Sequence, residues 1–304
     1  MKKRYLILFS LSILQACSEP PTGEPNYTDE YTISKNYQTV LSVKNSTGRE
    51  LKRARMLLYI PVEKASSQKM TKLTIDKPYK LSKDGVGNQL VNIDYENLAV
   101  DYEESIHLSF EMQLASDLNV LQEGDVGNGL ITRLDLPEDE KALFDKLLKE
   151  VQGQDNINKL QVLSASLKNN MTLLDRQEAI HQYGESNNEA SLQRKIGIVS
   201  LVDKKATLRG QSNLLLAMLR ASDVTARWVL GISSQGTTQL KQADAQLWIQ
   251  YREQGRWHLF DVNAGQEIKE YTDKIIFRII PDLIEQEFTA PEQLLYEGVG
   301  VNKV

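Results

Sequence analysis

The sequence has 304 residues, of which 41% are hydrophobic, enough to build a sizeable core. Its formal net charge of −5 gives no basic surface for nucleic acid, so we expect no nucleic-acid partner. A single cysteine excludes an internal disulfide. With only three histidines and no glycine-rich phosphate loop, the sequence predicts neither a metal site nor a cofactor.

The N-terminus has the pattern of a secretory leader that ends in a cysteine. Three basic residues at 2–4 precede an apolar run at 5–14, which is about half of the ~20 residues needed to span a bilayer. The run leads into Leu14-Gln15-Ala16-Cys17, which resembles the lipobox of bacterial lipoproteins. We therefore expect residues 1–16 to be a signal peptide and Cys17 to carry a lipid. An ordinary signal peptide with a coincidental cysteine is the alternative.

Loss of the leader would take the formal net charge from −5 to −8, so charge would not draw the mature protein to an anionic membrane. The lipid would anchor it, because acyl chains gain about 0.8 kcal/mol per buried CH₂. We expect a lipid-anchored protein of the bacterial envelope that faces the periplasm, and Ser18 after the cysteine favours the outer membrane. Residues 17–30 are rich in Pro, Glu and Thr and predict a flexible tether.

Residues 31–128 are expected to form an antiparallel β-sandwich domain. Five strand-like runs lie between residues 31 and 114, separated by turn formers such as those at 46–48 and 84–88. Turn chemistry alone accounts for the glycines and the asparagine of 84–88, which we interpret as structural. Alternation with a period of two is clearest at Ile106, Leu108, Phe110 and Met112.

Residues 129–304 are expected to form an α+β domain in which helices precede antiparallel strands. Helices are predicted over 137–151, 157–170 and 187–203. The segment 208–221 is apolar nearly all round from Leu214 to Leu219, which predicts a buried central helix. Strands are predicted over 226–233, 245–253, 256–263 and 274–281.

The motifs of this half resemble the transglutaminase-like superfamily, which has the papain-like fold. The text AMLRASDVTARWVLGI at 217–232 is similar to the Leu-Leu-Arg-Ala and Gly-Ile-Pro-Ala-Arg segments of that family. The segment 246–248 stands where the family has His-Ala-Trp, and 261–263 where it has Asp-Pro-Thr. The resemblance covers roughly residues 130–265. It implies a buried helix packed on an antiparallel sheet, preceded by a β-domain.

The resemblance also places the three catalytic residues of the family. Counted back from Arg220, the nucleophilic cysteine falls on Leu208, which has no ionisable atom. Gln246 replaces the general-base histidine, and its amide cannot take up a proton near pH 7. The orienting acid remains as Asp261, for which a strand-end residue that caps a turn or stays solvated is the alternative reading. The resemblance thus implies an inactive member.

A degenerate cleft predicts a binding module for a peptide or protein of the envelope. One alternative is a transglutaminase-like or protease-like hydrolase with an unusual nucleophile, for which Ser212 lies one helical turn after Leu208. Its weakness is the lack of a placed base, since His258 is expected to face solvent. Another alternative is an accessory subunit of an envelope complex. The candidates to line the cleft, with core packing as the competing interpretation, are Trp228, Trp248 and Trp257.

Overall fold

The computed structural model describes residues 30–45, 47–121, 138–174, 178, 199–280 and 296–297. The predicted leader, Cys17 and all of the predicted tether except Glu30 lie outside the described residues. Within the described part, no helix is both long enough and apolar enough to cross a bilayer.

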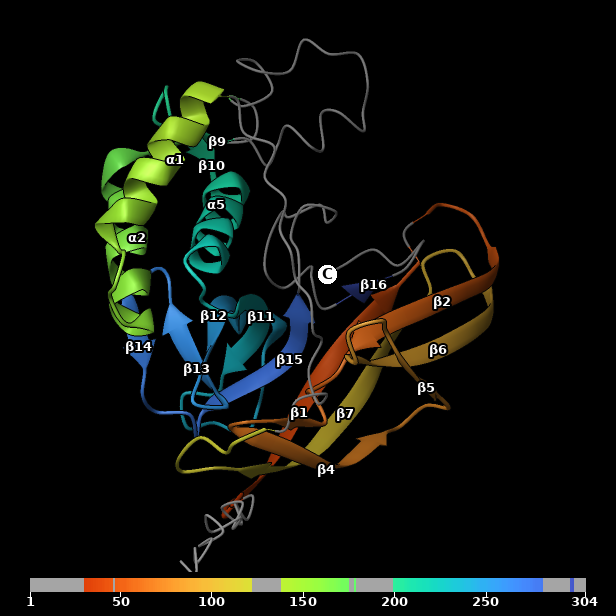
Figure 1. Cartoon of the computed structure of the whole chain (residues 1–304). Helices are drawn as coiled ribbons and strands as arrows, with labels where there is room; N and C mark the ends of the chain where they lie inside the picture. Colours follow the sequence, from red (N-terminus) through yellow and green to blue (C-terminus); the bar gives the residue numbers. More distant parts are fainter. Residues whose placement is uncertain are drawn as a thin grey trace, which may run out of the picture.

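Two antiparallel sheets form the N-terminal part (Figure 1). One has the strand order β1-β7-β4-β3 and the other β16-β2-β6-β5. The alternating residues of the last long strand, from Ile106 to Met112, are buried as the pattern predicted, and the antiparallel β fold is confirmed. The strands are β1 (Ile33–Lys44), β2 (Leu51–Tyr59), β3 (Lys64–Ala65), β4 (Gln68–Ile75), β5 (Lys80–Lys83), β6 (Gln89–Leu98) and β7 (Glu103–Leu114).

The strand β16 (Tyr296–Glu297) brings the end of the chain back to the N-terminal sheets. It pairs antiparallel with β2, with Tyr296 opposite Leu58 and Glu297 opposite Leu57. The expected boundary between residues 128 and 129 assigned this segment to the second domain. A two-residue strand gives no periodic signal in the sequence, so only the three-dimensional structure reveals this pairing.

A five-stranded antiparallel sheet with the order β14-β13-β12-β11-β15 forms the second part. This sheet lies between the helices and the two N-terminal sheets (Figure 1). A small sheet, β8-β10-β9, lies beside the helices. The elements are α1 (Glu138–Glu150), α2 (Asn156–Asn170), β8 (Thr172–Leu174), β9 (Val199–Ser200), β10 (Lys205–Thr207), α5 (Leu208–Ala221), β11 (Ala226–Ser233), η1 (Gln242–Asp244), β12 (Ala245–Glu253), β13 (Arg256–Asp261), β14 (Gln266–Ile268) and β15 (Lys274–Ile280).

The buried central helix is α5. It begins at Leu208 because Thr207 caps it, with Thr207 Oγ1 accepting a hydrogen bond from the Gly210 N–H at 3.1 Å. Residues 214–219 are all buried, as the continuous apolar run predicted. The prediction of a helix over 187–203 is wrong for the described residues of that range, 199–203. There β9 pairs with β10 and a turn follows. Pairing with β10 outweighs the local helical pattern there, and residues 187–198 lie outside the described ones.

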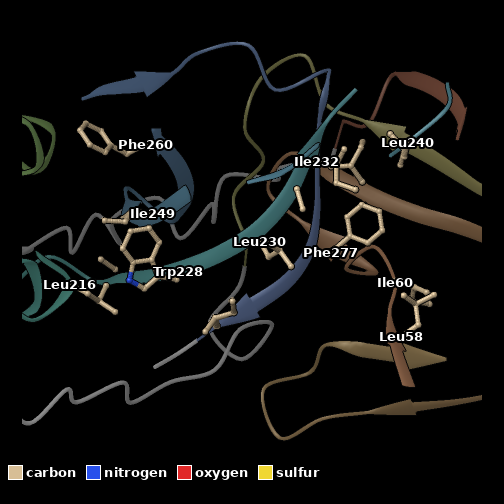
Figure 2. Close-up of a cluster of buried hydrophobic side chains, with 14 of the residues drawn as sticks. Leu58, Ile60, Leu216, Trp228, Leu230, Ile232, Leu240, Ile249, Phe260 and Phe277 are labelled. Atoms are coloured by element: carbon tan, nitrogen blue, oxygen red, sulfur yellow. The ribbon is translucent and has the colours of Figure 1, made fainter. Parts of the chain in front are cut away.

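The apolar core is continuous between the two parts. In Figure 2, Leu58 and Ile60 of the N-terminal part lie near Phe277, and the same cluster continues to Trp228 beside the helices. Phe277 also meets Phe110 of β7 edge-on, with ring centroids 6.0 Å apart. The two expected domains therefore share one core.

Two buried amide side chains reinforce this junction. Gln68 donates from Nε2 to the Ile276 carbonyl at 2.9 Å and accepts at Oε1 from the Ile276 N–H at 2.7 Å. Asn88 makes the same pair of contacts with Ile279, each at 2.7 Å. On one edge β15 pairs with β11. On the other edge, the two amides come from the N-terminal part and supply hydrogen-bond partners to the backbone N–H and C=O groups of Ile276 and Ile279, as a neighbouring strand would.

The role of Asn88 corrects the turn interpretation. Within 84–88, only Gly87 has a positive φ, of 90°, so turn geometry requires neither Gly85 nor Asn88. Asp84 holds the turn instead, because its Oδ1 accepts from the N–H groups of Val86 at 3.0 Å and Asn88 at 2.9 Å. Asn88 is fully buried and reaches across to β15.

We predict that Asn88→Ala lowers the free energy of unfolding by at least about 2 kcal/mol, because it leaves the buried N–H and C=O of Ile279 without partners. Chemical denaturation of the full chain measures this. Asn36→Ala is the matched control, since Asn36 is an exposed asparagine of β1. Equal stability of the two variants would contradict the proposed role of Asn88.

Candidate binding cavity

A cavity of about 640 Å³ lies where α2, α5 and β8 meet the ends of β12 and β13. It gathers four of the predicted positions, because Ser212, Trp228, Gln246 and Asp261 all contribute to its lining. Gln246 lies near the start of β12 and Asp261 ends β13. These strands are antiparallel neighbours, so the two positions fall at the same end of the sheet. Leu208 is the first residue of the helix that supplies Ser212.

Asp261 holds the turn that follows β13. Its Oδ1 accepts hydrogen bonds from the N–H groups of Asn263 at 2.8 Å and Ala264 at 3.0 Å. The Gly265 N–H also bonds to the Asp261 carbonyl at 2.8 Å. This turn explains why the strand predicted to reach residue 263 stops at 261. The side chain has the capping role that was the alternative to a catalytic one.

The remaining lining combines apolar and polar groups. Leucines of α2, β8, α5 and β12 contribute apolar surface, together with Val262. Lys168 donates from Nζ to the Asn263 carbonyl at 3.1 Å, and Gln211 donates from Nε2 to the Leu167 carbonyl at 3.0 Å. Lys168, Gln211 and Asn263 were not among the residues predicted to line the cleft. Asn263 lies in a segment matched to the family, but the two helical residues carry no local signal.

Trp228 contributes to the cavity lining, although only 2% of the residue is exposed. Figure 2 shows its indole among Leu216, Ile249 and Phe260, between α5 and the sheet. Its main contacts are therefore with the core, and it closes the inner wall of the cavity.

Trp248 and Trp257 lie elsewhere. Trp248 is buried in a separate apolar cluster and packs over Gly231, where the ring leaves no room for a side chain. The Trp257 ring stacks under the Arg227 guanidinium, whose Cζ lies 3.8 Å from the ring centroid. Burial, and secondarily the charge of Arg252, lowers the pKa of Arg227. Neither tryptophan belongs to the lining, so both have the core role that was the competing interpretation.

His258 is half-buried and bonded, which corrects the expectation that it faces solvent. Its Nδ1 lies 2.9 Å from Glu267 Oε1, and its ring stacks on Tyr251 at 5.1 Å between centroids. Tyr251 donates to the same Glu267 oxygen at 3.0 Å, and burial followed by the charge of Glu267 raises the pKa of that phenol. His258 does not contribute to the cavity lining.

Among the described residues, the lining supplies hydrogen-bond donors and acceptors, one cationic residue and one anionic residue. None of its described side chains is a histidine or cysteine, so no group with an ordinary pKa near 7 is among the described lining residues. Over the described ranges, no group of three His, Cys, Asp or Glu residues could hold a metal ion.

Comparison with known proteins finds a family model that matches part of the chain. Residues 149–262 match the model of the transglutaminase-like superfamily, which confirms the resemblance. No curated protein matches the chain.

The chain is also similar to three solved structures. A protein provisionally described as a cysteine protease from Cytophaga hutchinsonii has 13% identity and a TM-score of 0.47, with 88% of this chain and 85% of that one covered. A TGase has 11% identity and a TM-score of 0.27, covering 64% and 44%. A provisionally described protease from Parabacteroides distasonis has 14% identity and a TM-score of 0.20, covering 79% and 48%. The chain spans less than half the length of the last two.

We predict that Gly231→Ala destabilises the protein by about 3 kcal/mol, because the new Cβ would meet the Trp248 ring and lie 2.7 Å from the Ile275 carbonyl oxygen. Thermal unfolding followed by circular dichroism measures the loss. Gly85→Ala is the control, since nothing lies within 4 Å of a Cβ there and its φ is not positive. A Gly231→Ala protein as stable as the control would show that Trp248 is not packed against β11.

Proposed function

Residues 149–262 form a transglutaminase-like domain, and we propose that it serves as a binding module for a peptide or protein, without the thiol chemistry of its family. The observation that carries this proposal is the gathering of Ser212, Gln246 and Asp261 around one cavity of about 640 Å³. That volume falls in the range of ordinary ligand pockets, roughly 300–1,000 Å³.

The residue types at the reactive positions support binding over catalysis. Leu208 at the start of α5 cannot form a thiolate, and the one cysteine of the chain is at position 17. Gln246 can donate and accept hydrogen bonds but cannot act as a general base near pH 7. Asp261 already holds a turn through its Oδ1. These groups can bind a polar ligand without changing it.

A hydrolase that uses Ser212 is the second candidate, favoured by the position of Ser212 on the cavity wall with Asp261. Its hydroxyl needs a base to become a nucleophile, and the described histidine nearest in sequence to this wall, His258, is bound to Glu267 instead. Turnover of a peptide amide by the purified protein, abolished in Ser212→Ala, would favour this candidate over ours.

The third candidate is an accessory subunit, which stable cross-linking to one membrane protein would support.

We further propose that the protein is lipid-anchored at Cys17 and faces the periplasm, with the outer membrane as its expected site. The lipobox-like residues before Cys17 and the Ser18 after it support this. Such a location would place the cavity among peptides and proteins of the envelope.

We predict that Leu173→Glu lowers recovery of the bound partner at least tenfold, because it introduces a charge into an apolar wall of the cavity. The measurement is affinity capture from detergent-solubilised envelope, together with binding of a random peptide mixture in solution. Leu81→Glu is the matched control, since Leu81 is an equally exposed strand leucine (54% against 50%) that does not line the cavity. Equal recovery by both variants, or no partner and no peptide binding for the unmodified protein, would sink the proposal.

For the anchor, we predict that Cys17→Ser abolishes labelling by a radioactive fatty acid and moves the protein from the membrane to the soluble fraction. The reason is that no other residue of the leader region can carry a thioether-linked lipid. Ser18→Ala should keep both label and membrane association. An unlabelled wild-type protein, or a Cys17→Ser protein that stays in the membrane, would contradict lipid attachment.

A further inference from the structure

Two residues of opposite charge line the cavity without forming an ion pair with each other. Lys168, in the last turn of α2, and Asp261, at the end of β13, both line it. No ion pair within 4.0 Å joins these two described residues. A cavity with a cation and an anion held apart favours a ligand that carries both charges.

The turn after β13 fixes how far apart these charges lie. Lys168 Nζ bonds to the carbonyl of Asn263, and Asp261 Oδ1 bonds to the N–H of the same residue. Because both groups are tied to a single residue, backbone bond lengths limit the distance from Nζ to Oδ1 to at most about 10 Å. The two charges are therefore more than 4.0 Å but no more than about 10 Å apart.

Both groups keep hydrogen-bonding capacity for a ligand. An ammonium has three donors, and Lys168 uses one of them on Asn263. Asp261 uses Oδ1 for the turn, while its Oδ2 accepts no hydrogen bond from the described residues. The amide of Gln246, which also lines the cavity, adds a donor and an acceptor suited to a peptide group.

We propose that the cavity binds a short zwitterion, either an amino acid or a peptide of up to three residues with both ends free. Its carboxylate would meet Lys168 and its ammonium would meet Asp261. An extended chain covers about 3.3–3.6 Å per residue, so one to three residues match the separation of the two charges. This inference rests on the proposed binding function and names its ligand class.

The two charges together also provide selectivity. A ligand with one charge would be attracted by one group and repelled by the other. A neutral internal segment of a protein would displace water from both charged groups without replacing the hydrogen bonds of that water. Free chain ends, and not the side chains between them, are thus the recognised features.

Calorimetry on the full chain tests this with dialanine and a mixture of free dipeptides, each compared with N-acetylated, C-amidated and doubly blocked forms. We expect blocking either end to weaken binding at least tenfold. In Lys168→Gln, C-amidation of the peptide should no longer weaken binding, whereas N-acetylation still should. Asp261→Asn, which keeps an Oδ1 acceptor for the turn, should remove the discrimination against N-acetyl forms alone. Lys149→Gln and Asp145→Asn, exposed positions of α1 outside the cavity lining, are the matched controls.

Doubly blocked peptides that bind as tightly as free ones would overturn the zwitterion proposal while leaving peptide binding intact. Binding of free peptides that neither variant changes would overturn the assignment to Lys168 and Asp261. Absence of binding for every free amino acid, dipeptide and tripeptide tested would also overturn it. The effect of Leu173→Glu on a larger captured partner would still test the proposed function separately.

Discussion

The backbone groups on the edge of β15 that faces away from β11 must find hydrogen-bond partners. The rest of the structure depends on which side chains supply them. Gln68 and Asn88 supply them from residues 208 and 191 positions away along the chain. Their amides carry the same donor and acceptor as a peptide group, so each can replace part of a neighbouring strand. Through β15 this contact orients β11, and β11 in turn supports α5. The N-terminal sheets are thus part of the framework that positions the cavity.

Within that framework, we interpret the cavity as the geometry of a transglutaminase-like site without its chemistry. The capped start of α5 and the neighbouring ends of β12 and β13 come from packing and strand pairing, which do not need a thiol or an imidazole. In our proposal, leucine and glutamine stand at the reactive positions, where they would leave that packing possible while removing proton transfer and nucleophilic attack. What remains at the cavity is a set of hydrogen-bonding groups and two separated charges, which we interpret as a recognition surface.

Local periodicity was enough to predict most elements, because most of the apolar residues of α5, β11 and β12 are buried. It failed at 199–203, where pairing with a later strand determines the structure. The family motifs predicted Gln246 and Asp261 as site residues, and both line the cavity. Composition could not show that Trp228 lines the cavity whereas Trp248 and Trp257 do not. Lys168 and Asn88 went unrecognised because their partners, Asn263 and Ile279, are remote in sequence.

We propose that the cavity is a catalytic site that has lost its reactive groups. The most direct test is the reactivity of the new thiol in a Leu208→Cys, Gln246→His protein. In a Cys17→Ser background the new thiol is the only one in the chain. The rate of alkylation is measured against pH, with Leu208→Cys alone as the control. A cysteine at the start of α5 near an imidazole should become reactive well below the ordinary thiol pKa of about 8.5, and more so in the double variant than in the control. An ordinary thiol in both proteins would contradict the account.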